Sequence, residues 1–175
     1  MTKILIVSDS HGLTTELIKI KEKHAHEVDL LIHCGDSELS AIEPCLAGYS
    51  VVRGNCDFEG DFPEELMKDV ADFRLYITHG HQYSVKSTLL NLSYQAKEQR
   101  ADIVCFGHSH SLGAEMIEQI LYINPGSIRF PGGRTEKTYI ILEFEKRDLI
   151  LKVYDIQQGE ISELTQKFSF SKEAY

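Results

Sequence analysis

No apolar run in the 175-residue sequence approaches the roughly 18 residues that a membrane-spanning helix requires. The first aliphatic run, residues 4–7, is cut short by the polar residues 8–11, so it does not resemble a secretion signal. These absences predict a chain that works in the cytoplasm and not in a membrane.

Cysteine and basic charge are also scarce. The four cysteines, Cys34, Cys45, Cys56 and Cys105, form no Cys-x-x-Cys pair, which disfavours a structural zinc site and predicts four free thiols in a reducing compartment. Lys and Arg number 18 against 27 Asp and Glu, for a net charge of −9. This balance disfavours long nucleic acid as a partner. A small phosphate substrate is still allowed, because bound metal ions would reverse the charge locally.

The apolar runs predict an α/β protein. Buried strands are expected over residues 3–8, 29–33 and 50–53, with helices over 14–24 and 40–46 between them. This β-α-β-α-β order predicts a parallel sheet with right-handed crossovers.

The second half of the sequence has a different pattern. Residues 65–70 and 73–78 predict a hairpin, and a helix over 85–100 precedes a buried strand over 102–106. No prediction is made after residue 157, and no repeat or linker divides the chain, so one α/β domain over 1–175 is expected. The remaining strands are expected over 115–120, 122–124, 137–144 and 149–154.

Polar clusters follow five of the predicted strands. In an open α/β sheet the carboxyl ends of the strands meet at one crevice, so clusters that are distant in sequence should converge. In chain order the clusters are Asp9 with His11, Asp36, Asn55 with Asp57, His79-Gly80-His81, and Gly107-His108-Ser109-His110.

These residue types predict a metal centre. Imidazole and carboxylate suit manganese, iron, nickel or zinc without any thiolate. Five to seven ligands exceed what one ion with an open position needs. Two ions about 3.5–4 Å apart, with one carboxylate bridging them, would bind phosphoryl oxygens and turn a shared water into hydroxide near neutral pH.

The series also resembles the signature of a known family. Asp9-Ser10-His11, Gly35-Asp36, Gly54-Asn55, His79-Gly80 and Gly107-His108-Ser109-His110 are similar to the motifs of the calcineurin-like metallophosphoesterases. The stretch Asn124-Pro125-Gly126-Ser127 and the short chain narrow the resemblance to small bacterial and archaeal phosphodiesterases. It spans about residues 2–155.

The resemblance implies a fold, cofactors and roles. The fold would be two facing mixed β-sheets flanked by helices, a four-layer αββα sandwich. The cofactors would be two divalent ions, with manganese first and nickel, iron and zinc as alternatives. Carried over residue by residue, one ion would be held by Asp9, His11, Asp36 and His110 and the other by Asp36, Asn55, His79 and His108, with Asp36 bridging; the candidate catalytic residues are Asp36, Asn55, His79 and Asp57.

One position departs from the wider family. Most members have His after Gly-Asn, followed by Asp or Glu, whereas this chain has Cys56 and then Asp57. The small phosphodiesterases commonly have Cys there. The change puts in doubt any mechanism that needs a histidine acid at this point, and it leaves Asp57 a structural role.

Other polar residues have plainer interpretations. His24 and His26 are expected on a solvated surface, and His33 in a hydrogen-bonded interior position. His81 is expected to touch either substrate or a ligand. Residues 124–127 form either a tight turn or, less readily, a substrate contact. Nothing in the sequence selects Arg129 or Arg134 as a phosphate contact.

The predicted function is hydrolysis of a small phosphodiester by a hydroxide that bridges two metals. The alternatives are a phosphomonoesterase on the same metals, a non-catalytic scaffold similar to the retromer subunit of this fold, and a nuclease. The complete ligand set favours an enzyme over the scaffold, and the acidic charge disfavours the nuclease. Whether the chain forms a homo-oligomer is left open.

Overall fold

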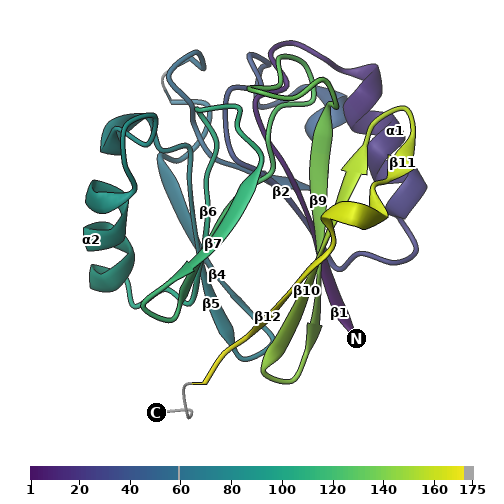
Figure 1. Cartoon of the computed structure of the whole chain (residues 1–175). Helices are drawn as coiled ribbons and strands as arrows, with labels where there is room; N and C mark the ends of the chain where they lie inside the picture. The colour runs from purple at the N-terminus through teal and green to yellow at the C-terminus, as the bar shows by residue number, and fades with distance from the viewer. Residues whose placement is uncertain (59, 172–175) are drawn as a thin grey trace.

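The structure is a computed structural model, which describes residues 1–58 and 60–171. Two β-sheets lie face to face, with helix α1 on the outer face of one and helix α2 on the outer face of the other (Figure 1). This arrangement confirms the predicted α/β sandwich of two mixed sheets flanked by helices.

The first sheet, sheet A, contains the N-terminus. Its central strands β1, β2 and β3 are parallel, and β9 and β10 extend it as an antiparallel ribbon beside β1. The order is β11-β10-β9-β1-β2-β3, with β12 also paired to β10. The bounds are β1 (Thr2–Val7), β2 (Leu30–His33), β3 (Tyr49–Val51), β9 (Thr138–Glu145), β10 (Asp148–Asp155), β11 (Gly159–Glu160) and β12 (Gln166–Ser169).

The second sheet, sheet B, has the order β4-β5-β6-β8-β7. Strands β5, β6 and β8 are parallel, and the antiparallel strands β4 and β7 close the two edges. The bounds are β4 (Glu65–Val70), β5 (Phe73–Thr78), β6 (Ile103–Cys105), β7 (Gly113–Ile117) and β8 (Ile120–Asn124). The hairpin predicted for residues 65–78 is confirmed.

The predicted boundary between strands β7 and β8, at Leu121, was wrong. The chain reverses instead at Glu118 and Gln119, whose φ angles of 50° and 65° form a tight turn of the kind that joins twisted antiparallel strands. Leu121 is fully buried in the core, so it belongs to the strand.

The helices are shorter than predicted. Helix α1 is Thr15–His24 and α2 is Leu90–Glu98, and the short 3₁₀ turns are η1 (Pro44–Leu46), η2 (His81–Tyr83) and η3 (Ser162–Leu164). The helix expected over 40–46 reduces to η1, because the residue before Pro44 is held extended. The helix expected over 85–100 begins late, because Ser84 is left-handed and residues 84–88 form a turn. None of the described helices is long and apolar enough to cross a membrane.

Alternation of side chains along the central strands builds the core. Ile4 and Ile6 of β1 point between the sheets, while Leu5 and Val7 pack beneath α1. In sheet B, Leu75 faces the other sheet and Tyr76 packs beneath α2. Strands buried on both faces require continuous apolar runs, which is the pattern that the sequence shows.

The C-terminal segment, for which the sequence made no prediction, closes one end of the inter-sheet core. Strand β12 pairs with β10, and the buried ring of Phe170 lies 4.8 Å from the ring of Phe73 in an edge-to-face contact. The segment therefore contributes apolar burial to the core between the sheets.

Phe170→Ala should lower the free energy of unfolding by about 3 kcal/mol, since it removes a buried ring and leaves a cavity. Urea unfolding followed by circular dichroism measures the change. Phe58→Ala is the matched control, because Phe58 is 71% exposed. Equal stability of the two variants would contradict the packing assigned to Phe170.

Candidate metal centre

The loops after the parallel strands meet at the strands' carboxyl ends. Backbone hydrogen bonds join them directly: the Asp9 N–H donates to the Gly35 carbonyl (3.0 Å), and the His11 N–H to the Asp36 carbonyl (3.0 Å). Within sheet B, the Gly107 N–H donates to the His79 carbonyl (3.0 Å), and across the two sheets the His108 N–H donates to Asp9 Oδ2 (3.1 Å). Loops from both sheets therefore form one connected unit.

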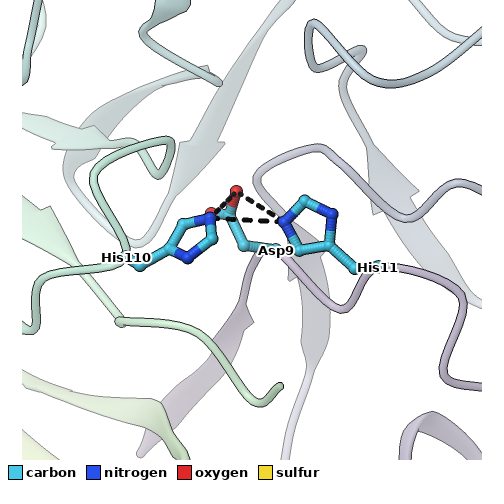
Figure 2. A group of neighbouring side chains, drawn as sticks. All are labelled: Asp9, His11 and His110. Atoms are coloured by element: carbon cyan, nitrogen blue, oxygen red, sulfur yellow. Dashed lines mark hydrogen bonds and ion pairs between the residues drawn. The ribbon is translucent and has the colours of Figure 1, made fainter. Parts of the chain in front are cut away.

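These loops bring the predicted ligand types into groups whose coordinating atoms lie within 4.8 Å of one another. One group is Asp9, His11 and His110, and Figure 2 shows the two imidazole rings facing each other beside the Asp9 carboxylate. A second group is Asp36, His79 and His108. A third links them through His11, Asp36 and Cys56.

The tautomers of His11 and His110 are fixed by what their outer nitrogens touch. His110 Nδ1 donates to the Phe130 carbonyl oxygen (2.7 Å), and His11 Nδ1 donates to the Glu38 carboxylate (2.5 Å). Both Nε2 atoms point into the centre, where they lie 3.2 Å apart and are 3.8 Å (His11) and 3.3 Å (His110) from Asp9 Oδ1. A cation that replaced the ring protons there would be bound by two imidazoles and a carboxylate, so the donor set fits a metal ion.

His79 is held in a similar way by His81. Their Nδ1 atoms are 3.1 Å apart, so one nitrogen donates to the other. His79 Nε2 lies 3.1 Å from Asp9 Oδ1 and 3.3 Å from Asp36 Oδ2. Of the two interpretations left open by the sequence for His81, the structure favours the one in which it touches a candidate ligand.

Asp9 is a fully buried carboxylate of the centre. Its Oδ2 accepts hydrogen bonds from the Ser8 hydroxyl (2.6 Å) and the His108 N–H (3.1 Å). Burial raises the pKa of the Asp9 carboxyl, but hydrogen bonds from His110 and His79 outweigh it and hold the pKa well below its usual range. Burial, with His79 nearby, lowers the pKa of His108 to about 4. The carboxylate is therefore ionised and His108 neutral at pH 7, as metal ligation requires.

Asp36 belongs to the second and third groups and is positioned by Asp57. Asp57 Oδ2 accepts the N–H groups of Asp36 (2.8 Å) and Gly54 (2.7 Å), and Oδ1 accepts that of Glu38 (2.8 Å). Both oxygens of Asp57 are thus engaged by backbone, which fits the structural role expected for it better than a role in catalysis.

The backbone at the candidate ligands is left-handed. The φ angles are 52° at Asp9, 42° at His11, 56° at Asp36, 69° at His108 and 60° at His110. Asp and His tolerate this region better than most residues, but it still costs energy and persists only where surrounding contacts impose it. Its concentration here is typical of a functional site.

Glycine at two positions leaves room for the carboxylates of Asp36 and Asp9 against the neighbouring backbone. A Cβ on Gly54 would lie 2.0 Å from Asp36 Oδ1, and one on Gly107 would lie 2.2 Å from Ser8 Oγ and 2.5 Å from Asp9 Oδ2. No side chain fits at either position without displacing a candidate ligand.

The sequence matches the family model for the calcineurin-like phosphoesterase superfamily domain over residues 2–147. The chain belongs to the calcineurin-like phosphoesterase superfamily. A probable metallophosphoesterase of Bacillus subtilis, YsnB, is 49% identical over 164 residues, which are 94% of this chain and 97% of the relative. Phosphodiesterase MJ0936 of Methanocaldococcus jannaschii is 32% identical over 71% of this chain and 82% of its own length.

Solved structures agree with this membership. A predicted phosphoesterase from Streptococcus pneumoniae superposes with a TM-score of 0.90 at 32% identity, covering 96% of this chain and 97% of that one. Vacuolar Protein Sorting 29 from Cryptosporidium parvum shares the fold alone, with a TM-score of 0.77 at 18% identity over 96% of this chain and 98% of its own.

The segment Asn124–Ser127 braces the metal centre through hydrogen bonds to its loops. The Asn124 amide donates to the Gly107 carbonyl (3.2 Å) and to the Ser109 hydroxyl (2.9 Å). The buried Ser127 hydroxyl donates to the Asp9 carbonyl (2.7 Å) and accepts the N–H groups of Arg129 (3.1 Å) and Phe130 (2.8 Å). These contacts account for both side chains without a substrate contact.

Three further residues complete the comparison with the sequence. His33 is fully buried as expected: Nδ1 accepts the Gly35 N–H, Nε2 donates to the Ser10 hydroxyl, and burial lowers its pKa to about 4. Asn55 is exposed and its amide reaches Cys56 Sγ (3.6 Å), so its ligand role stays a prediction. Desolvation and the Asp36 carboxylate raise the pKa of Cys56 to about 11, which keeps it a thiol.

The surface position expected for His24 was wrong. His24 is 3% exposed, because its ring lies between Glu27 (2.5 Å) and the hydroxyl of Tyr139 (2.8 Å). Its partner Tyr139 is 115 residues away in sequence, so local polarity gave no indication. His26 is exposed, as expected. Neither residue belongs to the metal centre groups.

Ser127→Ala should weaken manganese binding by about tenfold, because residues that orient ligands typically contribute ten- to a hundredfold to metal affinity. Manganese titration followed by electron paramagnetic resonance measures the dissociation constants. Ser93→Ala is the matched control, as its hydroxyl donates to Leu90 of α2. Unchanged affinity in Ser127→Ala would show that the brace does not position Asp9.

Proposed function

We propose that this chain is a metal-dependent phosphodiesterase that hydrolyses a small phosphodiester at a two-ion centre. The observation that carries the proposal is the two neighbouring ligand groups, which Asp36 links by belonging to one and lying within 4.8 Å of His11 in the other, with the Nε2 atoms of His11 and His110 3.2 Å apart. Asp9, His11 and His110 would hold one ion. Asn55, His79 and His108 would hold the other, and Asp36 would contact both.

Two divalent ions held there would polarise the phosphoryl oxygens and supply a nucleophile from water near neutral pH. The chain's own residues position and tune this chemistry. Glu38, His81 and the Phe130 carbonyl set the ring tautomers, and Asp57 and Ser127 fix the loops. Imidazole and carboxylate ligands suit manganese, iron, nickel or zinc, and manganese is the ion that we propose to test first.

Little in the described site would protonate the leaving group. Most family members have a histidine where this chain has Cys56, and a thiol with a pKa of about 11 is a weak acid at neutral pH. We therefore infer that the substrate's leaving group is stabilised mainly by the metal centre.

A diester is favoured over a monoester by the name of one relative, phosphodiesterase MJ0936. The manganese-loaded protein should turn over bis(p-nitrophenyl) phosphate at least tenfold faster than p-nitrophenyl phosphate. The same chromophore is released from both, so initial rates compare directly. A reversed preference would replace the phosphodiesterase with the phosphomonoesterase alternative.

Removal of metal should abolish turnover, because the described residues of the centre include no Ser-His-Asp nucleophile that could act in its place. The test is dialysis against a chelator, metal analysis to verify the loss, and readdition of manganese, which should restore the rate. Full activity in verified metal-free protein would rule out the proposal. Metal binding without hydrolysis of any ester would instead support the scaffold alternative.

Asp36→Asn should lose at least one of two bound ions and nearly all turnover, since it removes charge where both groups meet while nearly preserving shape. Inductively coupled plasma mass spectrometry counts the ions per chain. Asp72→Asn is the matched control, because Asp72 lies in the turn between β4 and β5. Two ions still bound to Asp36→Asn would show that Asp36 does not bridge.

A further inference from the structure

An aromatic side chain stands exposed beside the metal centre. Phe130 is 52% exposed, and its ring centroid lies 5.6 Å from that of His11. Single exposed apolar residues are common on protein surfaces. This one differs in its position, since it contacts the ring of one candidate ligand and its carbonyl holds the other, His110.

The backbone of Phe130 is fixed on both sides. Its N–H donates to the buried Ser127 hydroxyl (2.8 Å), and its carbonyl accepts from His110 Nδ1 (2.7 Å). Two residues on, the Gly132 N–H donates to the His110 carbonyl (2.8 Å). The backbone that bears the ring is therefore held in place by hydrogen bonds. A ligand that packs against the ring would not have to order a loop.

Arg129 supports the ring and adds positive charge. Its guanidinium carbon lies 4.9 Å from the Phe130 ring centroid, and its NH1 donates to the His11 carbonyl. A cation over an aromatic face is a favourable contact. The surface beside His11 thus combines an open aromatic ring with a fixed positive charge in a chain whose net charge is −9.

We propose that Phe130 forms the wall of a subsite that binds a planar aromatic or heteroaromatic group esterified to the substrate's phosphate. This inference rests on the proposed function, because the phosphate must sit at the ligand groups for its ester group to reach the ring. An aromatic ring packs against such a group by stacking or edge-to-face contact, whereas a methyl group gains little there. The substrate class is then an aryl or nucleoside phosphodiester, not a simple alkyl or glycerol diester.

The test measures binding instead of turnover. Phenylphosphonate and methylphosphonate present the same phosphoryl oxygens, and their carbon–phosphorus bonds resist hydrolysis. Isothermal titration calorimetry on the manganese-loaded protein should give about tenfold tighter binding of phenylphosphonate, a difference of about 1.4 kcal/mol. Phe130→Ala should reduce this ratio to about twofold, leaving methylphosphonate affinity within twofold of its original value. Phe130→Tyr should keep the ratio.

The control variant is Tyr94→Ala, which removes an aromatic side chain that is 60% exposed on α2 and should keep the tenfold ratio. Adenosine 5′-monophosphate, compared with phenylphosphonate in a competition experiment, distinguishes a nucleoside from a simple aryl group: tighter binding of the nucleotide that depends on Phe130 identifies the nucleoside.

Two results would overturn the subsite. One is equal binding of the two phosphonates by the original protein. The other is a ratio that persists in Phe130→Ala; if both ligands bind that variant equally more weakly, Phe130 only supports His11 and His110. Absence of binding by either phosphonate would overturn the subsite and the phosphoryl site together. A Phe130-dependent preference in a protein that hydrolyses no diester would reject the proposed function and retain the subsite.

Discussion

The buried carboxylate of Asp9 is the constraint on which the metal centre depends. A fully buried negative charge is stable only when hydrogen bonds and positive charge compensate it. Here Ser8 and the His108 backbone supply the hydrogen bonds to one oxygen, while His79 and His110 face the other. Loops from both sheets must therefore close over Asp9, which brings the two ligand groups together.

The rest of the site keeps these loops in a strained conformation. Left-handed residues at the ligands would relax without support. Asp57 holds the loops after β2 and β3 through three backbone N–H groups, and Asn124 and Ser127 hold the loops after β6 and β1. Asp57, Asn124 and Ser127 thus act as braces and not as ligands, and they keep the ligand-bearing loops in place.

The sequence predicted the sheets and the ligand types because both depend on local patterns of residues. Continuous apolar runs indicate strands buried on both faces, and His and Asp directly after such strands indicate a shared crevice. The sequence did not predict features that depend on contacts between residues far apart in the chain. Ser127 binds Asp9 from 118 residues away, and His24 is buried by Tyr139. The prediction also overextended the helices expected over 40–46 and 85–100, since a helical stripe does not show where a turn at Pro44 or Ser84 interrupts it.

The central claim is that one carboxylate, Asp36, joins two metal sites. Anomalous diffraction from a crystal grown with manganese tests it most directly. The account predicts two anomalous peaks about 3.5–4 Å apart. One should be contacted by Asp9, His11 and His110 and the other by His79 and His108, with Asp36 touching both. A single peak, or two peaks of which only one contacts Asp36, would contradict it.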